Sequence, residues 1–319
     1  MKICCPEVKK ILMPTDLSEE ARGAVKYAAA LAETTQAELH ILHVFTAHNY
    51  DPQIAGNVMS GLKEALTHIE EQLRMKLRSE AEIHARERKI TVKDAVVRSM
   101  APYDAILRYA RENDIDRIIM GTQGLTGLSY VLLGSVTEKV VEFAPCPVLV
   151  VNQKERDFVD AEGHMLLNRI LYPTDFSEES TWAASRALEL AEAASAEIIV
   201  AHVVSPKESS SAARIRQLSE EDAQRQLAEE AEEALKKEAE KVFGDYEKVR
   251  CVVKHGRVPQ TLAKLAKEEL VDLVTISSTG ADALREQVTG SVAERFLRIS
   301  PCPILVTKQP YTNEKNLPH

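Results

Sequence analysis

A cluster of glycines in the first half of the chain has the composition and spacing of an anion-binding loop. Four of the twelve glycines lie within fourteen residues, at Gly121, Gly124, Gly127 and Gly134. Glycine lets another group approach the backbone closely, and successive backbone N–H groups ahead of a helix N-terminus bind phosphates. Ser135 could cap that helix or donate its hydroxyl to a phosphate, and Val136 and Thr137 would add backbone N–H groups. The alternative is a long flexible loop that ends in a helix cap.

The glycine loop differs from the two commonest phosphate-binding motifs. The chain has no Gly-x-x-x-x-Gly-Lys-Ser/Thr sequence, so a P-loop lysine is absent, and no Gly-x-Gly-x-x-Gly follows the first predicted strand. The pattern that remains is Gly121-x2-Gly124-x9-Gly134-Ser135. A phosphate at this loop would therefore be held by backbone amides and a helix N-terminus.

Strand-like and helix-like segments alternate along the chain and must position this loop. The predicted strands of the first half are residues 10–13, 39–45, 91–97, 117–120 and 148–152, and its predicted helices are residues 18–33, 58–88, 103–113 and 135–143. Strands of the second half are expected near Ile170, Ile198, Val249, Leu273 and Ile304. This alternation predicts an α/β fold with a doubly wound parallel sheet. Ligands of such sheets bind beyond the carboxyl ends of the strands, where the glycine loop begins.

The chain is internally duplicated. Residues 11–20 (ILMPTDLSEE) and 170–179 (ILYPTDFSEE) are identical at eight of ten positions. His43-Val44 matches His202-Val203 at the same offset, and Cys146 and Cys302 each stand between two prolines near the end of a half. The repeat predicts a first domain over residues 1–152, a charged linker over 153–168, a second domain over 169–308 and a polar tail over 309–319.

Taken together, the Pro14-Thr15-Asp16 turn, the His43-Val44 strand end, the glycine spacing and the final Pro-Cys-Pro strand resemble the universal stress protein family. The resemblance covers about residues 7–152 and 167–308. It implies two Rossmann-like domains, each with a five-stranded parallel sheet in the order 3-2-1-4-5 flanked by helices, and a tendency to pair through the fifth strands. Some members bind ATP or AMP through the glycine motif, whereas others lack the motif and do not.

The same resemblance implies a role for individual residues of the first half. Asp16, in the turn with Pro14 and Thr15, would lie near the ribose and the phosphates, and Val44 would contact adenine through its backbone. The ribose would be lined by Met120 and Gly121, and the phosphates would be held by Gly124, Gly134, Ser135 and Val136. The expected ligand is ATP, with AMP or ADP as alternatives and Mg²⁺ as a candidate companion.

The second half departs from this pattern. Ser277 stands where the first half has Gly121, Ala283 replaces the third glycine, and Asp282 and Glu286 bring negative charge into the loop. Carboxylates near a polyphosphate raise the repulsion. One interpretation is a degenerate pocket retained for folding, and the other is a site for a weaker or different ligand such as a monophosphate. The residues of a partial site would be Asp175, Val203, Gly280, Gly290 and Ser291.

Histidine and cysteine candidates have structural as well as chemical interpretations. His43 and His202 occupy equivalent strand positions, where a histidine bonded to a carbonyl is expected more often than a metal ligand. Cys146 and Cys302 are expected to be small apolar fillers rather than nucleophiles. The adjacent Cys4 and Cys5 lack a second Cys/His pair at metal-ligand spacing, so no metal site is predicted there.

Composition excludes several classes of function. The net charge is −9 without a basic tract, which argues against a nucleic-acid partner. The longest uncharged stretch, residues 118–137, contains four glycines and is interpreted as strand and loop, so no membrane span is expected. An odd number of cysteines without an export signal favours reduced thiols in the cytoplasm.

The resemblance implies an adenine-nucleotide-binding stress-response protein that acts as a regulatory or protective module through an unknown protein partner. Its apolar fifth strands, at residues 148–151 and 304–306, would pair as a pseudo-dimer within the chain, and a homodimer is left open. The loop at residues 48–61 is a candidate moving part. No catalytic residue is assigned, because Asp16 has no activating lysine or arginine in the pattern. The alternatives are a slow Mg-dependent ATPase that uses Asp16 and a nucleotide-independent scaffold.

Overall fold

The computed structural model describes residues 8–45, 71–72, 75, 89–122, 133–151, 158–159, 165–278 and 290–308. The elements of the first half are β1 (Lys10–Thr15), α1 (Glu19–Thr35), β2 (Glu38–Phe45), β3 (Val92–Arg98), α3 (Pro102–Glu112), β4 (Arg117–Gly121), α4 (Ser135–Phe143) and β5 (Val148–Val151). Those of the second half are β6 (Arg169–Pro173), α5 (Ser180–Ala194), β7 (Glu197–Val204), α6 (Pro206–Arg216), α7 (Glu220–Phe243), β8 (Val249–His255), α8 (Val258–Glu268), β9 (Leu273–Ser277), α9 (Ser291–Ile299) and β10 (Ile304–Thr307).

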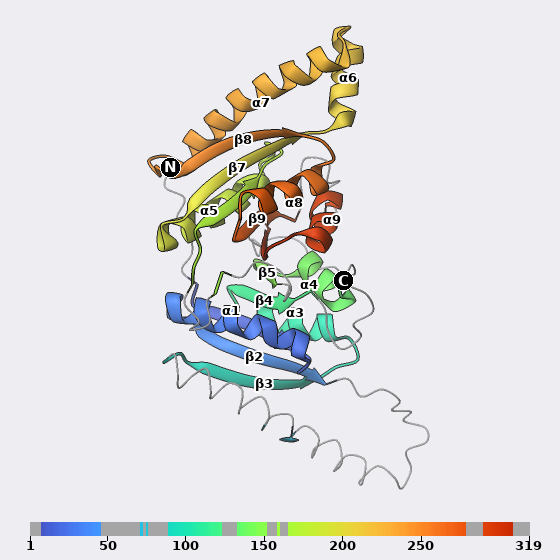
Figure 1. Cartoon of the computed structure of the whole chain (residues 1–319). Helices are drawn as coiled ribbons and strands as arrows, with labels where there is room; N and C mark the ends of the chain where they lie inside the picture. Colours follow the sequence, from blue (N-terminus) through green and yellow to red (C-terminus); the bar gives the residue numbers. More distant parts are fainter. Residues whose placement is uncertain are drawn as a thin grey trace, which may run out of the picture.

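The strands of both halves form one continuous sheet, which runs through the whole molecule in Figure 1. Its order is β3-β2-β1-β4-β5-β10-β9-β6-β7-β8, so each half has the strand order 3-2-1-4-5. Pairing within each half is parallel, whereas β5 and β10 pair antiparallel at the middle of the sheet. The predicted α/β fold and the pairing of the fifth strands are confirmed.

Helices cover both faces of the sheet and bury two apolar cores that each span the two halves. One core packs α1, α5 and α7 against the sheet, and the other packs α3, α4, α8 and α9 against the opposite face. The two middle strands supply both cores, because alternate side chains of a strand point to opposite faces. Leu149 and Leu305 belong to the first core, and Val150 and Ile304 to the second.

The predicted linker contributes side chains to the first core. Phe158 and Val159 are buried, and the Phe158 ring packs edge-on against Tyr27 of α1 with 4.7 Å between ring centroids. The backbone N–H of Leu166 donates to the Phe158 carbonyl at 2.7 Å, so this part of the linker is folded back on itself. The charged composition of the linker therefore did not indicate that Phe158 and Val159 are buried in the core.

Some predictions lie wholly or partly outside the described residues. These are the helix at 58–88, of which the structure describes three helical residues, the loop at 48–61, the tail at 309–319 and Cys4-Cys5. Among the helices that are described, none combines the length and the apolar composition that crossing a bilayer requires.

Candidate functional site

The turn between β1 and α1 is built by the side chains of the repeated Pro-Thr-Asp motif. Thr15 Oγ1 accepts a hydrogen bond from the Leu17 N–H at 3.0 Å, and Asp16 Oδ1 accepts from the N–H and the hydroxyl of Ser18 at 3.0 and 2.5 Å. Leu17 adopts a left-handed conformation with φ of 65°. Ser18 Oγ in turn accepts from the Ala21 N–H at 3.0 Å and caps α1. Asp16 therefore shapes the turn that presents it at the strand end.

A histidine joins the ends of the first two strands. His43 is buried, and its Nδ1 lies 2.8 Å from the Thr15 carbonyl oxygen. Because a carbonyl only accepts, Nδ1 carries the proton and donates it. The prediction that this histidine bonds a carbonyl is confirmed.

The glycine loop ends at a helix whose first turn is held against β4. The Gly134 N–H donates to the Thr122 carbonyl at 2.8 Å, and the Thr137 hydroxyl donates to the Gly121 carbonyl at 2.9 Å. Gly134 is the N-cap of α4, and no cap hydrogen bond from a side chain is present among the described residues. Ser135 is the first helical residue, so the expectation that Ser135 could cap this helix is corrected. The amides at this helix start form a positive end that can receive an anion.

Most of the predicted first-half residues come together at one edge of the sheet. Pro14, Thr15 and Asp16 end β1 or follow it, Val44 lies near the end of β2, and Met120 and Gly121 end β4. The carboxyl ends of these parallel strands share an edge, because Thr15 pairs with His43 and β1 also pairs with β4. Gly134, Ser135 and Val136 start α4 beside Gly121. Met120 is buried, Val44 and Gly121 are half-buried, and Gly124 lies outside the described residues.

The second half repeats the turn almost atom for atom. The Phe176 N–H donates to Thr174 Oγ1 at 3.0 Å, and Asp175 Oδ1 accepts from the N–H and the hydroxyl of Ser177 at 3.1 and 2.5 Å. His202 Nδ1 lies 2.9 Å from the Thr174 carbonyl and donates to it in the same way. The similarity of residues 11–20 and 170–179 is thus explained by the turn that their side chains stabilise in both halves.

The surroundings of this second turn differ from those of the first. The exposed ring of Phe176 packs on His202 with 4.6 Å between centroids, where the first half has Leu17. Val203 is buried, whereas its counterpart Val44 is half-buried. Gly290 is the N-cap of α9, with Ser291 as first helical residue, but Ala293 replaces Thr137 and supplies no hydroxyl. Gly280 lies outside the described residues.

Sequence reasoning missed a carboxylate of α7 that lies beside the second turn. Glu238 accepts hydrogen bonds from the Tyr172 hydroxyl at 2.6 Å and from the Thr174 hydroxyl at 3.0 Å. Burial is the main cause that raises the pKa of Tyr172, and the neighbouring carboxylate adds to it. The glutamates and lysines of residues 227–241 predict a solvated helix face, and the structure corrects this at Glu238, which is half-buried and accepts these two hydrogen bonds. The sequence feature that could have indicated a buried acceptor is Tyr172, because it places a hydroxyl where the otherwise similar first repeat has Met13.

The remaining candidates behave as structural residues. Burial raises the pKa of the Cys146 thiol to about 12, so the thiol is protonated at neutral pH and is a poor nucleophile. Cys302 is buried in the second core. Within the described ranges, no group of three or more His, Cys, Asp or Glu side chains is arranged to hold a metal ion.

Comparison with known proteins places the fold in a family. The model of the universal stress protein family matches residues 7–152 and again 167–308. Universal stress protein MJ0577 of Methanocaldococcus jannaschii is 35% identical over 156 residues, which cover 46% of this chain and 96% of that protein. A universal stress protein of Thermus aquaticus is 36% identical over 146 residues, or 45% of this chain and 98% of that protein.

A solved structure has the same two-domain architecture. The crystal structure of a universal stress protein from Archaeoglobus fulgidus superposes with a TM-score of 0.68 at 21% identity, covering 95% of this chain and 99% of that one. At this identity the likeness concerns the fold alone. With the two family matches, the chain belongs to the universal stress protein family and is a tandem member with two repeats.

Proposed function

We propose that the first half binds an adenine nucleotide, with ATP as the preferred ligand, and that the chain acts in the cytoplasm as a regulatory or protective module of the stress response. The observation that carries the proposal is the convergence of the β1–α1 turn, the ends of β2 and β4 and the start of α4 at one sheet edge. Membership of the universal stress protein family supports it, because the glycine spacing of nucleotide-binding members is complete in this half.

The donors at this edge suit a phosphate chain. The helix N-terminus of α4 has a glycine at its cap, so no cap side chain of its own occupies the position where an anion would approach. The Thr137 hydroxyl fixes that helix start against Gly121, which keeps the amides pre-organised. Gly124, Gly134, Ser135 and Val136 are the proposed phosphate-binding residues, and Val44, Met120 and Gly121 are proposed to contact the nucleoside.

Magnesium would reach this site together with the nucleotide. The described residues offer no metal-binding cluster of their own, and Mg²⁺ is commonly held by one or two carboxylates and the phosphates of a substrate. Among the motif residues proposed for this site, Asp16 is the carboxylate that could serve as a Mg²⁺ ligand. Its Oδ1 already accepts two hydrogen bonds from Ser18, so its principal role in the proposal is to shape the turn.

Equilibrium dialysis of the purified chain against ATP, ADP and AMP, with and without Mg²⁺, tests the proposal. We expect saturable binding of ATP, and a failure of all three nucleotides to bind at millimolar concentration would refute it. ATP turnover that disappears in Asp16→Asn while binding persists would instead assign the chain a slow ATPase activity. A protein partner retained only in the presence of ATP would identify the regulatory role.

A further inference from the structure

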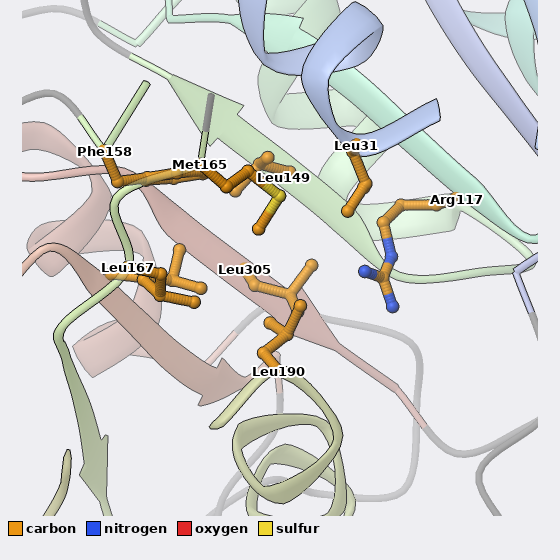
Figure 2. A pocket seen from close by; sticks show the side chains of 9 residues that line it. Leu31, Arg117, Leu149, Phe158, Met165, Leu167, Leu190 and Leu305 are labelled. Atoms are coloured by element: carbon orange, nitrogen blue, oxygen red, sulfur yellow. The ribbon is translucent and has the colours of Figure 1, made fainter. Parts of the chain in front are cut away.

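The seam between β5 and β10 has an approximate twofold symmetry in its apolar residues. Leu149 and Leu305 are opposite each other at its centre. Leu31 of α1 and Leu190 of α5, which are equivalent positions of the repeat, flank them beside a small cavity (Figure 2). Leucines of both halves and the side chain of Arg117 line this cavity.

Arg117 breaks this symmetry. It pairs with Ile11 in β1 as Leu273 pairs with the equivalent Ile170, so the first half carries a guanidinium where the second carries a leucine. The Arg117 side chain is 2% exposed and reaches from β4 toward α5 (Figure 2), with Nη2 3.6 Å from Glu189 Oε1. Nε of Arg117 has no hydrogen-bond partner among the described residues.

Glu189, the carboxylate that pairs with Arg117, also has no counterpart in the first half. The repeat places Ala30 at the position of Glu189. Glu189 also accepts from Arg186 at 2.7 Å, so two guanidinium groups share one carboxylate. In this contact across the seam, the buried cation therefore comes from the first half and its carboxylate from the second.

On the opposite face of the sheet, a second set of contacts across the seam is also asymmetric, but with the acidic residues in the first half and the basic residues in the second. Arg298 of α9 lies 3.4 Å from Glu138 of α4, and the Lys308 ammonium donates to the Glu142 carbonyl. The repeat places Glu142 at the position of Arg298. The first half is thus acidic where the second half is basic.

We propose that this seam is a heterotypic interface in which Arg117 selects the second half of the same chain through Glu189 and excludes pairing between two first halves. Two first halves joined through β5 in the same register would bury two Arg117 side chains against Ala30, without a carboxylate. A buried charge that loses its partner is strongly destabilising. Glu142 would also approach Glu138 of the other chain, which adds like-charge repulsion.

It follows that the β5 edge of the first half, where nucleotide binding is proposed, is complementary to the β10 edge of the second half and not to the β5 edge of a second chain. The chain is therefore expected to remain paired internally, and association of chains, where it occurs, should use another surface. This inference does not depend on whether a nucleotide binds.

A cysteine reporter in the full chain tests the selection. In a pair of first halves, residue 149 of one chain would face residue 149 of the other, because Leu149 faces its equivalent Leu305 within the chain. The Leu149→Cys variant is refolded from denaturant at high protein concentration under oxidising conditions, with Arg117 and Glu189 intact or with Arg117→Leu and Glu189→Ala combined. Mass spectrometry then quantifies the disulfide that joins position 149 of one chain to position 149 of another. Leu149→Cys with Leu305→Cys is the control for pairing within the chain.

We expect the symmetric background, which carries leucine and alanine on both sides, to give about tenfold more of the cross-link between chains. Equal yields in the two backgrounds, including none in both, would overturn the selection by Arg117.

Thermal unfolding supplies a second readout. Glu189→Ala should lower the melting temperature by about 5 °C or more, and adding Arg117→Leu should restore most of it. The exposed Glu192→Ala on the same helix is the matched control, and equal shifts for Glu189→Ala and Glu192→Ala would contradict the proposal.

Discussion

The two halves of this protein share a turn and differ in what surrounds it. In both halves a threonine, an aspartate and a histidine make the same hydrogen bonds at the end of the first strand. In the first half a threonine also ties the next helix start to Gly121, whereas the second half has Ala293 there and places Phe176 over His202. The comparison teaches that the repeated motif maintains the strand end, and the nucleotide binding proposed for the first half therefore rests on residues outside the motif.

The largest effect should come from placing a carboxylate at the two equivalent helix caps. Gly134→Asp should weaken ATP binding at least about tenfold, because the new charge occupies the end of the helix dipole and repels phosphate. It should also raise stability by about 0.5 kcal/mol, because aspartate caps a helix better than glycine. Gly290→Asp is the matched variant in the second half, with the same gain in stability and unchanged ATP affinity. Calorimetry and urea unfolding measure both quantities, and equal losses of affinity would break the comparison between the halves.

Removing the carboxylate that supports the second turn should mainly affect stability. Glu238→Ala leaves the hydroxyls of Tyr172 and Thr174 without their acceptor, which should cost about 1–3 kcal/mol. Urea unfolding measures the change, and exposed Glu233→Ala on the same helix should stay within about 0.5 kcal/mol of the parent chain. A Glu238 variant as stable as the Glu233 control would show that the network contributes nothing.

A smaller effect is expected at Thr137, the residue that distinguishes the two helix starts. Thr137→Ala reproduces the second half and removes the donor to the Gly121 carbonyl, at a cost of about 1 kcal/mol. ATP affinity should fall a few-fold because the amides of α4 lose an anchor. Thr137→Ser retains the hydroxyl and should restore affinity. If the alanine and serine variants bind ATP equally, the anchor has no part in binding.

The smallest effect is expected for Cys146. Its thiol has a pKa raised to about 12 by burial and stays protonated, so it has no chemical role in the account. Cys146→Ala should change ATP affinity by less than about twofold, within the range of an uninvolved site. Titration calorimetry measures it, and a tenfold loss would show that the cysteine was wrongly assigned as a filler.

Local patterns in the sequence predicted the strands and the histidine bond to a carbonyl. The family resemblance predicted the order of the strands in the sheet. Contacts between distant residues were not predictable in the same way. Arg117 lies in an ordinary strand, and nothing near it in the sequence indicates that Glu189 of the other half is its partner. Glu238 lies among many charged residues of α7, and only the packing of that helix on β7 and β8, which brings Glu238 to Tyr172 of β6, separates it from its solvated neighbours.

Titration of the unmodified chain with ATP in a calorimeter tests the central claim most directly, because it counts sites. The account predicts a single class of site with close to one ATP bound per chain, contributed by the first half. An absence of binding, or two equivalent sites of equal affinity, would contradict it.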